Sequence, residues 1–65
     1  MSVHKTMDHS GYIARTKTMS LASLRYVIGD ANAAIEAMPN GPNVGYYTDE
    51  VHYCCMEIAR RRRTK

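Results

Sequence analysis

The chain has 65 residues, a formal net charge of +3, and neither tryptophan nor phenylalanine. A chain of this length is one domain at most, and a domain this small buries too little apolar surface to be very stable alone. No segment approaches the roughly 20 apolar residues that span a bilayer, and the first residues lack the apolar run of a secretory signal, so we expect neither a membrane protein nor a secreted one.

The cysteines indicate the cellular compartment. Cys54 and Cys55 are adjacent, so a disulfide between them would be strained and would close no useful loop. Unpaired thiols are typical of a reducing compartment, and we therefore expect a cytoplasmic protein. A domain this small without a disulfide or a metal usually gains stability from a partner subunit.

The first part of the chain carries little periodicity. Residues 1–10 are polar, and we predict that they are disordered. The sequence also allows a short helix from Ser10 to Lys17, with Ser10 as its N-cap and with Tyr12 and Ile13 turned inward.

The helical pattern is clearest over residues 20–38. Ser20 is suited to cap this helix, and Pro39 ends it, because a proline disfavours the helical conformation of the residue before it. Apolar residues recur at alternating steps of three and four, which places them on one face. They are Leu21, Leu24, Ile28, Ala31, Ile35 and Met38.

A second row of mostly small residues lies almost opposite the first on the same helix. A helix that is apolar on two faces is normally covered on both, and small residues allow close approach of another backbone. We therefore predict a homo-oligomer joined through Tyr26, Gly29, Ala33 and Ala37. The alternative is an ordinary solvated face made of good helix formers.

Turn-forming residues occupy the predicted loop over residues 39–47, and a second helix is predicted over residues 48–63. Thr48 is a suitable N-cap, and the inward positions are Tyr47, Val51, Cys54 or Cys55, and Ile58. Because two helices joined by a short loop pack antiparallel, the sequence predicts an all-α fold. We expect residues 1–65 to form one small domain, an antiparallel helical hairpin that associates into a helical-bundle oligomer.

Catalytic and metal-binding patterns are absent from the sequence. A structural zinc site requires two chelating pairs, which His52, Cys54 and Cys55 do not provide. A cysteine nucleophile requires an oriented base and a pocket that excludes water, and neither is indicated. We therefore predict a protein that is not an enzyme, with no catalytic residues, no metal and no cofactor; the cysteines are interpreted as small buried hydrophobes.

The basic end of the sequence suggests an anion site. In an antiparallel hairpin, the end of the second helix lies beside the start of the first, whose N-terminal dipole favours negative charge. Arginines beside such a terminus can bind phosphate or carboxylate groups. The predicted site comprises Arg15, Lys17, Ser20, Tyr26, Arg60, Arg61, Arg62 and Arg63. The alternative is a solvated basic run that binds nothing in particular.

Several short motifs between Thr18 and Arg63 resemble small uncharacterised accessory proteins of tailed bacteriophages. The motifs are Met19-Ser20, Leu24-Arg25-Tyr26, Asp30, Ala34-Ile35, Gly45-Tyr46-Tyr47, Asp49-Glu50, His52-Tyr53-Cys54, Met56-Glu57 and Arg60-Arg61. This resemblance implies a phage accessory product in the host cytoplasm. Many such products block a host factor, or sequester a nucleotide signal of host immunity.

Three functions therefore stand as hypotheses. The first is a non-catalytic, phage-type binding protein that blocks or sequesters a host protein or a phosphate-bearing nucleotide. The second is a nucleic-acid-binding accessory protein that uses Arg60–Arg63, which would give steeply salt-dependent binding. The third is a virion or assembly component.

Overall fold

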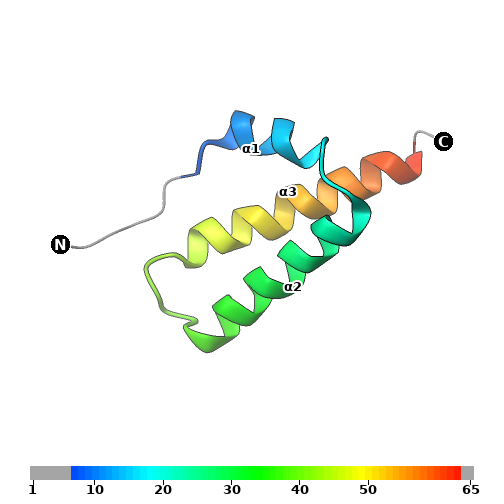
Figure 1. Ribbon diagram of the computed structural model, residues 1–65. Helices are drawn as coiled ribbons and strands as arrows, with labels where there is room; N and C mark the ends of the chain where they lie inside the picture. The colour runs from blue at the N-terminus through cyan, green and yellow to red at the C-terminus, as the bar shows by residue number, and fades with distance from the viewer. Residues whose placement is uncertain (1–6, 64–65) are drawn as a thin grey trace.

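The computed structural model describes residues 7–63, which form three α-helices and no strand: α1 (His9–Thr16), α2 (Leu21–Ala37) and α3 (Val44–Arg63). This confirms the predicted all-α fold. The two long helices run antiparallel and are joined by residues 38–43, and α3 lies between α1 and α2 (Figure 1). Among the described residues, no helix is long and apolar enough to cross a membrane.

Helix α1 begins earlier than the sequence pattern indicates. Asp8 is its N-cap in place of Ser10, because the Asp8 carboxylate accepts a hydrogen bond from the backbone N–H of Gly11 at 3.3 Å. Tyr12 turns inward and is buried. We predicted disorder for residues 1–10. Residues 1–6 of this range lie outside the described residues, and His9 and Ser10 belong to α1.

Helix α2 lies one residue inside the predicted bounds at each end. Ser20 is its N-cap, accepting a hydrogen bond from the backbone N–H of Ser23 at 3.0 Å. Leu24 and Ala31, in the middle of the apolar face, are almost completely buried. Leu21 lies at the margin of that face, and Met38 lies beyond the last helical residue; they are therefore 42% and 62% exposed.

Helix α3 begins at Val44, before the predicted start at Thr48. The backbone N–H of Tyr47 donates to the carbonyl of Asn43 at 3.1 Å, so Asn43 occupies the position from which the helix starts. The Thr48 hydroxyl donates to the Val44 carbonyl at 2.8 Å, a bond that threonine makes inside a helix. Thr48, the predicted cap, therefore lies inside α3, one turn after its start.

The core lies where the three helices meet. Each helix contributes one residue to it: Tyr12 from α1, Leu24 from α2 and Cys54 from α3. The phenol of Tyr12 donates to the Glu50 carboxylate at 2.9 Å, which anchors α1 on α3. Burial raises the pKa of the Cys54 thiol, which keeps it protonated. Cys55 is exposed, so Cys54 is the inward cysteine of the two.

Candidate functional site: a basic hollow between α1 and α3

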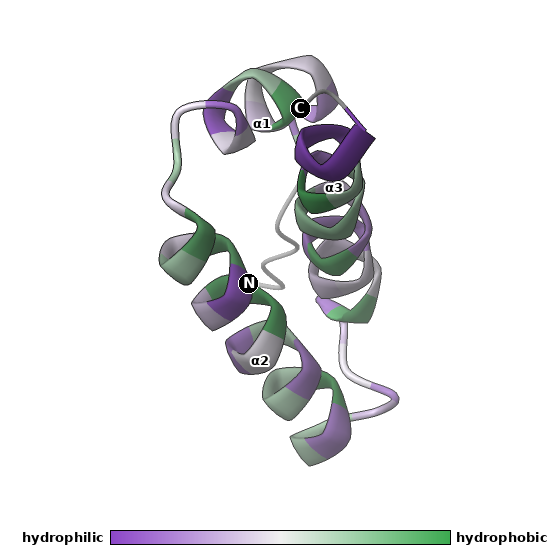
Figure 2. Ribbon diagram, turned by 90° about the vertical axis from the view of Figure 1, so that its right-hand side faces the viewer, coloured by the Kyte–Doolittle hydropathy of each residue, from purple (hydrophilic) through white to green (hydrophobic). Residues whose placement is uncertain are grey.

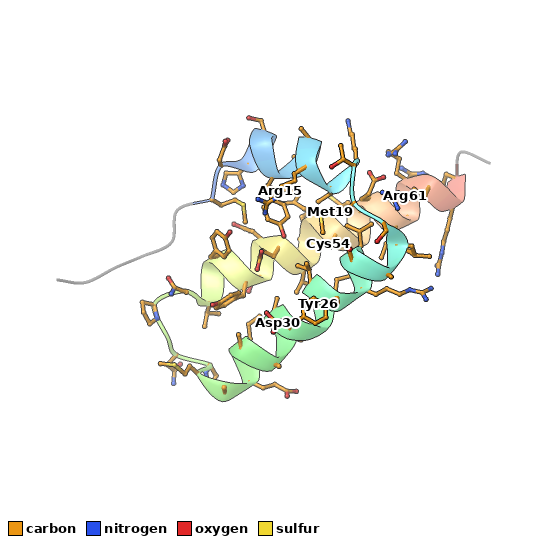
Figure 3. The ribbon with its side chains drawn as sticks, viewed as in Figure 1. Arg15, Met19, Tyr26, Asp30, Cys54 and Arg61 are labelled. Carbon is orange, nitrogen blue, oxygen red and sulfur yellow. The ribbon has the colours of Figure 1, made fainter. Side chains whose placement is uncertain are left out.

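Arg61, in the basic last turn of α3, has a structural role. Its guanidinium donates to the backbone carbonyl of Thr16, the last residue of α1, at 3.2 Å. It also donates to the carbonyl of Met19, in the connection between α1 and α2, at 2.6 Å; Figure 3 shows Arg61 and Met19 near each other. Carbonyls at the end of a helix lack partners inside it. The Thr16 carbonyl, at the end of α1, accepts from the backbone N–H of Met19 at 3.2 Å as well as from Arg61. Arg61 also donates to Glu57 at 2.7 Å, so the α1–α2 connection is fastened to α3.

Glu57 is the buried counter-charge of this end. Its side chain is 3% exposed and accepts two hydrogen bonds from Arg60, at 2.9 and 2.8 Å, besides the one from Arg61. Hydrogen bonds from Arg60 and then from Arg61 lower the pKa of Glu57 to about 2, from an ordinary value of 4.5. One buried carboxylate thereby orients two of the arginines.

Acidification should therefore destabilise the protein partly through Glu57. Because its pKa is lower in the folded chain than in the unfolded one, its contribution is complete above about pH 4.5 and is lost as the pH falls toward 2. We expect Glu57→Gln to lower the melting temperature at neutral pH, and to flatten its decline between about pH 5 and pH 2.5. Thermal unfolding followed by circular dichroism measures both; parallel declines in wild type and variant would contradict this role of Glu57.

A shallow hollow of about 240 Å³ lies between α1 and α3. It is beside the end of α3, which Figure 2 shows as strongly hydrophilic. Its lining residues are Ile13, Thr16, Lys17, Tyr53, Met56, Glu57, Arg60 and Arg63. One part of this lining is apolar, made by Ile13, Tyr53 and Met56. The other part carries the positive charges of Lys17, Arg60 and Arg63, together with the Glu57 carboxylate that pairs with Arg60. We call it the α1–α3 hollow.

The structure separates the remaining residues of the predicted anion site. Arg15 lies over the Tyr12 ring, 4.9 Å from its centre, and lines a different hollow with Met7, Asp8, Gly11 and Tyr46. In Figure 3 it lies well apart from Arg61 along the molecule. Ser20 is used as a helix cap, and Tyr26 is 72% exposed on α2.

Arg62 lies on the other side of α3. There it lines a hollow of about 190 Å³ with Leu21, Arg25, Ile58 and Arg61. Arg25 was absent from the predicted site, although it is another cation of the same end of the molecule. The basic residues around the end of α3 thus divide into two groups, one beside α1 and one beside α2.

Sequence reasoning did not assign Ile13 and Met56 to the site, although they form the apolar half of the α1–α3 hollow together with Tyr53. Tyr53, Met56, Arg60 and Arg63 follow one another at steps of three, four and three, so they form a stripe along one side of α3. The inward residues of α3 were identified from the same spacing, and this stripe lies on another face of that helix. Ile13 joins the stripe only through the packing of α1, which the pattern of α3 does not reveal.

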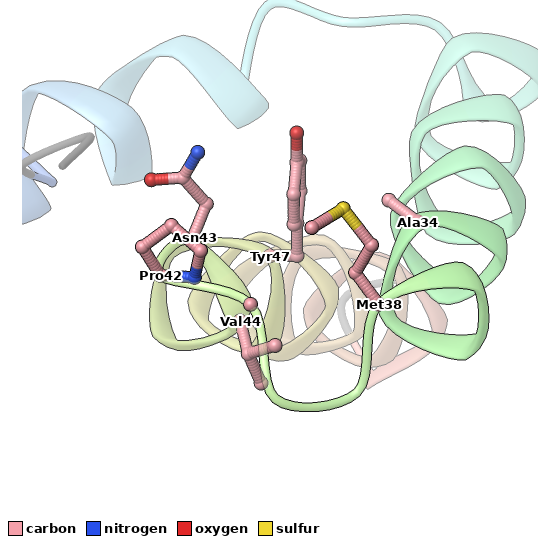
Figure 4. Close-up of a pocket in the computed structure, with 7 residues that line it drawn as sticks. Ala34, Met38, Pro42, Asn43, Val44 and Tyr47 are labelled. Atoms are coloured by element: carbon pink, nitrogen blue, oxygen red, sulfur yellow. The ribbon is translucent and has the colours of Figure 1, made fainter. Parts of the chain in front are cut away.

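A fourth hollow lies at the turn of the hairpin. It measures about 160 Å³ and is lined by residues from the end of α2, the loop and the start of α3. Met38 and Tyr47 lie beside each other there (Figure 4). Its lining has no charged side chain, so it lacks the chemistry expected of an anion site.

The residues considered for metal binding or nucleophilic chemistry are not gathered into a site. Cys54 is buried, whereas His52 and Cys55 are exposed. Within residues 7–63, no three histidine, cysteine, aspartate or glutamate side chains are grouped so as to hold a metal ion.

Comparison with known protein families, curated proteins and solved structures gives no match to this chain. The function is therefore argued from the geometry of its own residues.

Proposed function

We propose that this protein is a non-catalytic binding protein that sequesters a small phosphate-bearing ligand in the α1–α3 hollow. The observation that supports this proposal is the placement of Lys17, Arg60 and Arg63 around one recess that also contains Tyr53. Arginine and lysine bind phosphate through charge-assisted hydrogen bonds, and an aromatic ring offers a stacking surface to a base. A nucleotide combines both features.

Buried interactions support the idea that the cations are positioned before a ligand arrives. The Arg60 side chain is held by Glu57 through two hydrogen bonds, and the backbone of Lys17 lies in the connection that Arg61 fastens to α3. Side chains ordered in advance lose less conformational entropy when they bind. Such a site suits tight capture of a ligand without turnover.

The resemblance of Thr18–Arg63 to phage accessory proteins supports a host context for this binding. As part of the same proposal, the ligand is a nucleotide signal of the host and the protein acts in the host cytoplasm by removing it. A blocked host protein with a phosphorylated or acidic surface is the related possibility, because the same cations would contact it.

Titration calorimetry with a panel of mononucleotides and cyclic dinucleotides tests the proposal. Lys17→Ala and Arg63→Ala should each weaken binding about tenfold, because each removes one charged contact from a partly exposed site. Arg62→Ala is the matched control and should leave the affinity unchanged, because Arg62 lies on the other side of α3. Absence of binding by every nucleotide, or equal loss in all three variants, would contradict the proposal.

The second candidate is nucleic-acid binding, favoured by the cations on both sides of the α3 end. Arg25 and Arg62 face one way, and Lys17 and Arg63 face the other. An extended polyanion can contact both groups at once, whereas a single nucleotide cannot. In that case Arg62→Ala would weaken duplex DNA binding as much as Lys17→Ala does, and each would reduce the salt dependence.

A further inference from the structure

The face of α2 directed away from α3 has no covering element among residues 7–63. Helix α3 packs on the opposite face of α2, and α1 packs on α3. Tyr26 on this outward face is 72% exposed, and a Cβ atom placed on Gly29 would lie in open space. No neighbour among residues 7–63 therefore accounts for a glycine in the middle of this helix, where it weakens helix formation.

The two ends of this outward face carry opposite charges. Arg25 and Glu36 are separated by about three helical turns, or roughly 16 Å, and lie on nearly the same side of α2. Both side chains are exposed. The ion pairs found among residues 7–63 involve Glu57, and neither Arg25 nor Glu36 takes part in one.

We infer that α2 pairs with α2 of a second copy of this chain, antiparallel, about a two-fold axis near residues 30 and 31. This axis is perpendicular to both helices. It reverses the direction of the helix, but each edge of the contact face stays on the same side of the interface in both copies. Arg25 of each copy therefore meets Glu36 of the other, and two equivalent ion pairs form. A parallel pairing would leave both pairs unmade.

The same axis brings large and small residues together on the other flank. Tyr26 of one copy lies at the height of Ala33 and Ala37 of the other, where small side chains leave room for its ring. Gly29 lies close to the axis, where two helices separated by about 8–10 Å approach most closely. The second copy thus covers the exposed tyrosine and accounts for the glycine.

Asp30 should weaken the dimer, and this effect distinguishes an antiparallel from a parallel arrangement. It lies near the axis on the Tyr26 flank, on the same helix as Tyr26 (Figure 3), so the two copies bring their Asp30 carboxylates toward each other. Like charges at this distance weaken association. Removing the charge should strengthen an antiparallel dimer, whereas in a parallel dimer these carboxylates lie on opposite flanks.

Sedimentation equilibrium of charge-reversal variants tests this arrangement. We expect the wild type to dimerise at tens of micromolar, and Arg25→Glu and Glu36→Arg each to weaken the dimer by about tenfold or more. The double variant R25E/E36R should return to within about threefold of wild type, because both pairs form again with reversed polarity. Asp30→Asn should tighten the dimer.

Circular dichroism of diluted samples verifies that the variants keep their helices, as exposed substitutions should. A wild type that remains monomeric at about 100 µM would overturn the inference. So would a double variant as weak as the single ones, because the charges would then not meet across the axis. These outcomes are independent of ligand binding in the α1–α3 hollow, since none of the substituted residues lines it.

Discussion

Leu24→Ala should lower the free energy of unfolding by about 2–5 kcal/mol, which is most of the stability expected of a domain this small. Leu24 is completely buried and contacts the core residues Tyr12 and Cys54, so its removal leaves a cavity where all three helices meet. Urea denaturation followed by far-ultraviolet circular dichroism measures the loss. Protein concentration must be held constant, because association adds to apparent stability.

Leu21→Ala is the matched control, since it makes the same chemical change in the same helix. Leu21 is 42% exposed and lies at the margin of the apolar face, so we expect a loss below about 1 kcal/mol. Similar losses for the two leucines would show that the core is not centred on Leu24.

Arg61→Ala should cost about 2–3 kcal/mol, the second-largest effect we expect from a single substitution. It removes three hydrogen bonds from a charged donor, and it deprives the Met19 carbonyl of its 2.6 Å partner and the Thr16 carbonyl of one of its two donors. Arg61→Lys keeps the charge but loses the planar fork that reaches these acceptors, so we expect it to recover only part of the loss.

The same unfolding measurement on Arg62→Ala provides the control for charge. Arg62 is exposed, and its replacement should change stability by less than about 0.5 kcal/mol. If both variants lost equal stability, the basic run would act through its net charge rather than through the specific bonds of Arg61.

The long helices were predictable because their signals are local. The spacing of apolar residues in α2 and the cap at Ser20 require only neighbouring positions, and the structure places α2 within one residue of the prediction. The start of α3 was misplaced because Thr48 suits both a cap and an interior hydrogen bond to Val44. Sequence alone does not distinguish these uses, since the choice depends on whether the preceding residues continue the helix.

The candidate site was only partly predictable, because its assembly depends on tertiary packing. An antiparallel hairpin places Arg60 and Arg63 near Lys17, as expected from the topology. The direction of each side chain around α3 then separates Arg62 from Arg63, and the carbonyls of Thr16 and Met19 engage Arg61. Backbone carbonyls are present in every residue, so the sequence does not indicate which of them accept hydrogen bonds from Arg61.

The central position of α3 has a consequence for how the protein is made. The ribosome produces α1 and α2 first, yet these two helices share little contact and pack chiefly on α3. The connection between α1 and α2 is held to α3 by Arg61, which lies near the end of α3 and is therefore synthesised late. Until α3 emerges, the apolar face of α2 is exposed in the nascent chain, where it is open to chaperones and to aggregation. We therefore expect this domain to fold in one late step rather than progressively during translation.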